Sequence, residues 1–164
     1  MTPVDDVSIR NVTYHDWDAW RIEHGPLALT LVPQVGGRIM GMAWHGQELS
    51  FVNPACAGRV LDVAAIADVR DCKRELGFLL WGGDKTWLAP QSDWSDTVPF
   101  IDLDSGAYAL TIKDDAGSVS MVSPVCRETG VQITRSVRVG QRPAGWQVAH
   151  TLHNRSDQQV TWAP

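Results

Sequence analysis

Three tryptophans, two adjacent glycines and an Asp-Lys pair lie close together in residues 80–94 of a chain that has eight tryptophans in total. The flat apolar face of an indole can stack on a sugar ring, while charged side chains beside it hydrogen-bond to the sugar's hydroxyl groups. The segment therefore predicts a binding site for a sugar or another polyhydroxylated small molecule. We expect six of its residues to contact such a ligand: Trp81, Asp84, Lys85, Trp87, Gln91 and Trp94.

A purely structural role is the alternative for each of these residues. Core packing is the usual role of a single tryptophan, and its indole N–H then needs a buried partner. Asp84 and Lys85 could bind hydroxyl groups or act as an acid/base pair, or they could form a surface ion pair with no further role. The amide of Gln91 could donate to a sugar hydroxyl, but no second feature of the sequence supports that role.

Two further polar residues interrupt apolar strand faces. Arg135 lies on the face shared by Val131, Ile133, Val137 and Val139, and His150 lies between Val148 and Leu152. A buried arginine must be paired or hydrogen-bonded. A short Gly/Pro connection joins the two strands, so we expect them to pair antiparallel with both side chains on one face, within reach of each other. The face could point at a ligand, or a bulge or a satisfied core histidine could explain the pattern.

The composition excludes several classes of function. A net charge of −5 with scattered basic residues argues against nucleic acid as a partner. No apolar run is long enough to cross a membrane, and the N-terminus lacks the pattern of a secretory signal. Three widely separated cysteines predict reduced thiols and a cytoplasmic location. Without a Cys-x-x-Cys or a glycine-rich phosphate motif, we expect no metal and no cofactor.

Hydrophobic residues alternate with a period of two, and turn residues follow at short intervals, which predicts an all-β, antiparallel β-sandwich. One domain is expected over residues 1–164. A single helix is expected over residues 61–76, and a hairpin turn at 114–117. The expected strands cover residues 27–32, 38–44, 48–52, 108–112, 119–122, 131–139 and 146–152, with a last strand beginning at 160.

The last residues are apolar and follow directly on the start of that last strand. Natural domains seldom end in this way, because the edge of the sheet is left unpaired. The pattern therefore predicts that the domain is incomplete, with self-association through the unpaired sheet edge.

Three segments resemble the galactose mutarotase-like superfamily, which contains the aldose 1-epimerases. The Pro-x-x-Gly-Gly-Arg-Ile run within residues 27–39 is similar to an early hairpin of that superfamily. Residues 81–94 resemble an uncharacterised family within it, and residues 150–157 are similar to the strand and turn before its central strands. The resemblance implies a partial β-supersandwich that binds carbohydrate. The histidine acid and glutamate base of true mutarotases have no counterparts here, so the resemblance extends to the fold and not to the chemistry.

The sequence as a whole predicts a carbohydrate-binding protein related to aldose 1-epimerases that lacks the catalytic half. If it is active, the expected activity is that of an isomerase acting on sugars. Two alternatives stay open: a non-catalytic glycan-binding module, and a structural remnant without a ligand.

Overall fold

The computed structural model describes residues 7–113, 117–140 and 145–164, and it contains two antiparallel sheets with few helices. Residues 114–116 of the expected hairpin turn lie outside the described ranges. The first sheet is ordered β1 (Ser8–Tyr14), β2 (Trp17–His24), β3 (Leu27–Val32), β4 (Arg38–Trp44) and β5 (Gln47–Glu48). The second is ordered β6 (Ala109–Lys113), β7 (Ser118–Val122), β8 (Val131–Gly140) and β9 (Gly145–Asn154). The helices are α1 (Val69–Leu76) and α2 (Ile101–Asp104), with four 3₁₀ turns at Pro54–Cys56, Val63–Ala65, Gln91–Asp93 and Ser95–Thr97.

In both sheets, each strand pairs with its neighbour along the chain, as expected when short turns connect antiparallel strands. The apolar side chains of the two sheets pack against each other to form the main core. From the first sheet it contains Ile22, Leu27, Leu29, Leu31 and Ile39, and from the second Val119, Met121, Val137 and Val139, together with Tyr108.

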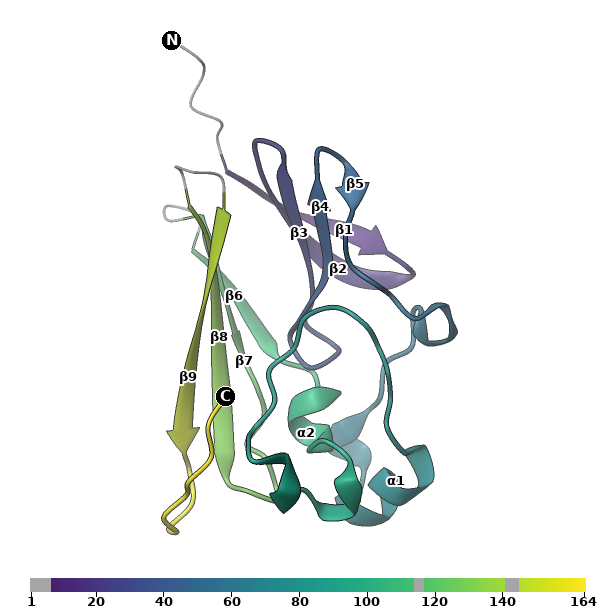
Figure 1. Cartoon of the computed structure of the whole chain (residues 1–164), viewed down its shortest axis with the longest axis vertical. Coiled ribbons are helices and arrows are strands. Elements are labelled where there is room, and N and C mark those ends of the chain that lie inside the picture. Colours follow the sequence, from purple (N-terminus) through teal and green to yellow (C-terminus); the bar gives the residue numbers. More distant parts are fainter. Residues whose placement is uncertain (1–6, 114–116, 141–144) are drawn as a thin grey trace.

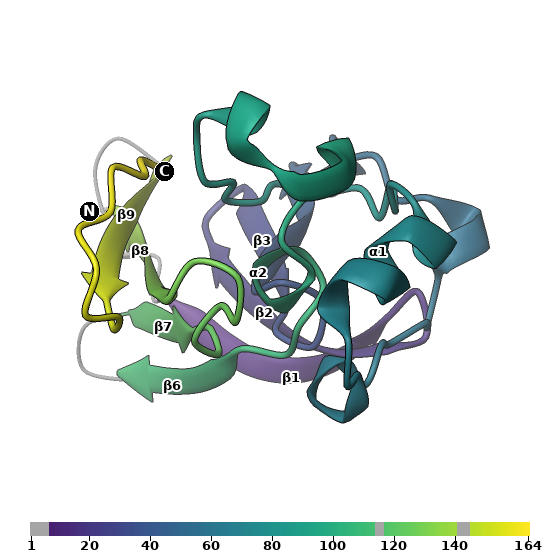
Figure 2. The ribbon, with the colours of Figure 1, turned by 90° about the horizontal axis from the view of Figure 1, so that it is seen from below.

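The long connection between the sheets comprises residues 49–108. It forms a second packing layer across one end of the molecule, where α1 and α2 lie (Figures 1 and 2). It packs on the remaining part of the inward face of β8, where Val131 and Ile133 contact Leu88, Trp94 and Phe100. The inward face of β8 therefore runs from the core between the sheets to the core beneath the connection. Arg135 lies where these two cores meet.

The expected helix over residues 61–76 is only partly confirmed. Residues 69–76 form α1, which ends at Gly77 with a φ of 63°. The chain before it forms only the 3₁₀ turn Val63–Ala65. The physical reason is Asp68, whose carboxylate accepts hydrogen bonds from the backbone N–H groups of Arg70 and Asp71 and so starts a new helix.

Two of the expected strands are also corrected. The strand over residues 48–52 shortens to β5, because Val52 forms an isolated bridge with Gly82 of the long connection. The strand expected from residue 160 does not form. Val160 and Trp162 instead pack into the core beneath the connection, and Ala163 forms an isolated bridge with Ala89. Strands β1 and β2 were not predicted.

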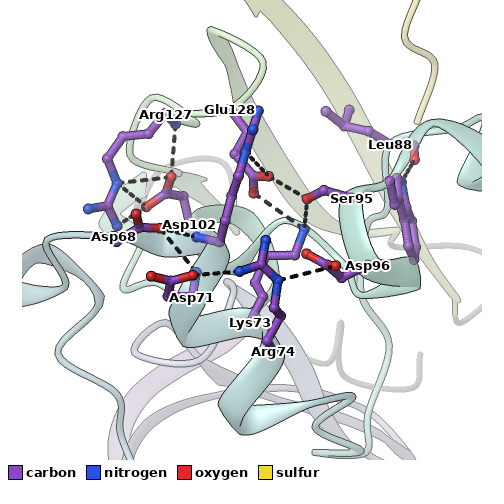
Figure 3. A network of polar contacts seen from close by, with 12 residues as sticks. Asp68, Asp71, Lys73, Arg74, Leu88, Ser95, Asp96, Asp102, Arg127 and Glu128 are labelled. Carbon is purple, nitrogen blue, oxygen red and sulfur yellow. Dashed lines mark hydrogen bonds and ion pairs between the residues drawn. The ribbon is translucent and has the colours of Figure 1, made fainter.

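A polar network fastens α1 and the connection to the loop before β8 (Figure 3). Lys73 of α1 is fully buried, and its ammonium lies 2.9 Å from the hydroxyl of Ser95 and 3.4 Å from the carboxylate of Glu128. Beside it, the guanidinium of Arg127 pairs with Asp102 at 2.8 Å. Every buried charge in this network has a partner of opposite sign, so its role is structural.

Among the described residues, no helix is long and apolar enough to cross a membrane.

Candidate functional site

The carboxylate of Asp104, at the end of α2, is the centre of the candidate site. One of its oxygens, Oδ1, accepts hydrogen bonds from Arg38 at 2.8 Å, from the ammonium of Lys85 at 3.0 Å and from the indole of Trp87 at 3.3 Å. Arg38 and Asp104 are almost fully buried. A buried carboxylate that pairs with two cations in this way fixes the segment carrying Lys85 and Trp87 to the end of α2.

The other carboxylate oxygen of Asp104 leads to the first tryptophan of the segment. It accepts a hydrogen bond from the hydroxyl of Ser105, which in turn accepts one from the indole N–H of Trp81 at 3.0 Å. Trp81 is 1% exposed and belongs to a core cluster. Trp94 is buried as well, and its indole N–H donates to the carbonyl of Leu88 at 2.8 Å. The expectation that Trp81 and Trp94 contact a ligand is therefore wrong, because both indoles are satisfied inside the protein.

Trp87 is half-buried, and its role as a stacking platform stays a prediction. The ammonium of Lys85 lies 3.9 Å from the centre of its ring, which is a cation–π contact. Trp94 and Phe78 contact it edge to face, at centroid distances of 5.0 and 5.9 Å. Lys85 is thus held by Asp104 and by aromatic rings, and burial lowers the pKa of its ammonium while Asp104 opposes that shift.

Asp84 lies on the other side of the same segment and points outward. Its backbone forms an isolated bridge with Ile39 of β4. Its carboxylate accepts a hydrogen bond from Arg135 at 2.7 Å, yet the side chain is 62% exposed. Asp84 and Lys85 therefore do not form the surface ion pair considered above: each pairs with a different residue of the site.

Arg135 is fully buried and holds Asp84 in place. Its guanidinium donates to the backbone carbonyls of Gly37 at 2.8 Å and Asp84 at 3.3 Å, as well as to the Asp84 carboxylate. The close approach of this backbone depends on glycine. Gly36 and Gly37 have positive φ values, 62° and 55°, and a Cβ at Gly36 would overlap the carbonyl of Asp104.

His150 lies directly opposite Arg135 in the register between β8 and β9. Residues opposite each other in an antiparallel pair share a face, so the expectation that Arg135 and His150 occupy one face is confirmed. His150 is exposed. Partial burial and then the nearby positive charge of Arg135 lower the pKa of the His150 imidazole, and Asp84 acts in the opposite direction.

Gln91, the remaining candidate, is exposed in the 3₁₀ turn Gln91–Asp93. Within the described ranges no side-chain hydrogen bond joins it to Asp84 or His150. In those ranges there is also no group of three or more His, Cys, Asp and Glu side chains placed to hold a metal ion.

The sequence interpretation included neither Asp104 nor Arg38 among the expected ligand contacts. The side chain of Arg38 is 1% exposed and pairs with Asp104. Its place directly after two glycines was the available signal. Asp104 gave none, because nothing in its local sequence indicates that Arg38, 66 residues away, is its partner.

Comparison with known proteins adds no relative: no family model, curated protein or solved structure matches this chain.

Proposed function

We propose that this protein binds a carbohydrate at the surface formed by Asp84 and His150, with Arg135 behind them and Lys85 and Trp87 at its side. We call this surface the Asp84 site. The observation that carries the proposal is the exposed carboxylate of Asp84, which is held at 2.7 Å by a fully buried arginine. An exposed carboxylate fixed by a buried cation is ready to bind without first losing rotamer freedom.

The chemistry of the exposed groups suits neutral hydroxyls. One carboxylate oxygen of Asp84 accepts from Arg135, and the other can accept from a sugar hydroxyl. The lowered pKa of His150 keeps its imidazole neutral at neutral pH, so that one ring nitrogen donates and the other accepts. An anionic ligand is disfavoured because it would meet the Asp84 carboxylate. The resemblance of residues 27–39 and 81–94 to the galactose mutarotase-like superfamily supports the same ligand class.

Catalysis of aldose epimerisation is a second candidate. A carboxylate next to a neutral imidazole can in principle remove a proton from one sugar oxygen and supply one to another. Binding is the proposal that we favour, because the exposed carboxylate held by Arg135 supports it without any reaction step. Polarimetry of freshly dissolved α-glucose separates the two: faster equilibration than in buffer indicates an epimerase, and an unchanged rate leaves binding.

Asn in place of Asp84 is expected to weaken sugar binding by about tenfold or more, because a hydrogen bond to a charged group contributes roughly 1.5–3 kcal/mol. Isothermal titration calorimetry with a panel of neutral aldoses measures the effect. Asp18→Asn is the matched control, since Asp18 is an exposed aspartate on β2 whose carboxylate contacts only Asn11 among the described residues. Equal affinities in the parent and Asp84→Asn would remove Asp84 from the site, and the absence of binding by any aldose would overturn the proposal.

A further inference from the structure

Strand β9 is an open edge of the second sheet. Within the described part of the chain it pairs only with β8, so one row of its backbone N–H and C=O groups faces no strand. The ten residue pairs between β8 and β9 run from Val131–Asn154 to Gly140–Gly145 without a shift in register. An edge strand of this length and regularity is a ready template for pairing with another strand.

The sequence of β9 lacks the features that normally block such pairing. Its ten residues contain no Asp, Glu, Lys, Arg or Pro, and no bulge interrupts the strand. The other three edge strands are different: β5 has only two residues, β6 has five and ends in Lys113, and β1 carries Arg10. Pairing with a strand of another molecule is thus disfavoured at β1, β5 and β6 and left possible at β9.

We infer that β9 pairs with β9 of a second copy of this chain, so that the two four-stranded sheets become one sheet of eight strands. The inference rests on the sheet and is independent of the proposed function. A second copy fits because two uncharged strands can approach each other without repulsion or unpaired charges, and one two-fold axis satisfies both open edges at once.

The side-chain pattern restricts where this axis can pass. Opposed residues of an antiparallel pair lie on the same face, and the residues of β9 alternate between faces. A two-fold axis perpendicular to the sheet must therefore pass through a residue and not between two residues, and the largest overlap of the two ten-residue strands places it at residue 149 or residue 150. In these registers Trp146, which is 43% exposed, lies opposite Leu152 or Asn154 of the second copy and loses exposed apolar surface.

The same restriction provides a charge test. Ala149 and Thr151 are exposed and lie on the face opposite to His150. In both registers, Ala149→Lys/Thr151→Lys places lysine against lysine across the axis, and Ala149→Glu/Thr151→Glu places glutamate against glutamate. Each variant is expected to be a monomer, and an equimolar mixture of the two is expected to dimerise again, because lysine then faces glutamate. Mere loss of folding would not be reversed by mixing.

Size-exclusion chromatography with light scattering measures the mass. The parent should approach twice the 18.1 kDa of one chain as its concentration rises, and each variant should stay at 18.1 kDa. Ser8→Lys/Thr13→Lys, which adds the same charge at exposed positions of β1, is the control and should dimerise like the parent. A parent that stays monomeric at all concentrations, variants that still dimerise, or a mixture that stays monomeric would each overturn the inference.

Discussion

Replacing Asp104 with Asn is expected to lower the free energy of unfolding by about 3–5 kcal/mol, the cost of removing one partner from a buried ion pair. The side chains of Arg38 and Asp104 are 1% and 7% exposed, and Lys85 also depends on the same carboxylate. An amide of the same shape leaves both cations in a poorly hydrated environment without a counter-charge. Urea unfolding followed by circular dichroism measures the change.

Asp96→Asn is the matched control for this prediction. Asp96 also pairs with an arginine, but its side chain is 35% exposed and that of Arg74 is 58% exposed. Exposed pairs contribute about 0–1 kcal/mol, so the control should unfold almost like the parent. If Asp104→Asn cost no more than this control, Asp104 would not be the centre of the site.

Lys73→Met is expected to destabilise the protein by a similar amount, about 3–5 kcal/mol. The ammonium of Lys73 is fully buried beside Glu128, whose side chain is only 7% exposed (Figure 3). Without Lys73, the buried carboxylate of Glu128 keeps the hydroxyl of Ser95 but loses its only fully buried counter-charge in the described part of the chain. Thermal and urea unfolding measure the loss.

Two further variants separate charge from packing in this network. Arg74→Met, in the same helix, removes an exposed cation and should cost about 1 kcal/mol or less. Lys73→Met/Glu128→Leu removes both charges, so it should be more stable than Lys73→Met alone. A double variant less stable than the single one would show that Glu128 contributes through its hydrogen bond from Ser95 and its packing, and not as the counter-charge of Lys73.

The part of the site that the sequence predicted follows from local rules. Arg135 and His150 each interrupt an apolar face of period two, and a short connection makes antiparallel pairing the default, so both residues could be placed on one face. Asp84 could be singled out because it lies next to two glycines and a lysine. The placement of Arg135 and His150 depends on neighbours in the sequence, which is why it agrees with the register of β8 and β9, whereas the role of Asp84 stays a prediction.

The part that the sequence did not predict depends on distant partners. A buried tryptophan and a ligand-contacting tryptophan look alike in a sequence, and the difference for Trp81 is a hydrogen bond to Ser105, 24 residues away. Asp104 was missed for the same reason, because its partner Arg38 lies 66 residues away in the sequence. Strand β1 was missed for another reason: it has no fully buried residue, so polar side chains weaken its alternation. Asp68 split the expected helix because its capping role competed with the helical pattern around it.

The central claim is that Asp84 and His150 face a bound sugar, and NMR of the His150 imidazole during an aldose titration tests it most directly. We expect the His150 signals to shift saturably in the parent, to need about tenfold more sugar in Asp84→Asn, and to show an imidazole pKa below its ordinary value in the free protein. The signals of His15 and His45, which lie in turns of the first sheet, should stay in place. Unmoved His150 signals while sugar binds, or equal shifts in all the histidines, would contradict the assignment of the site.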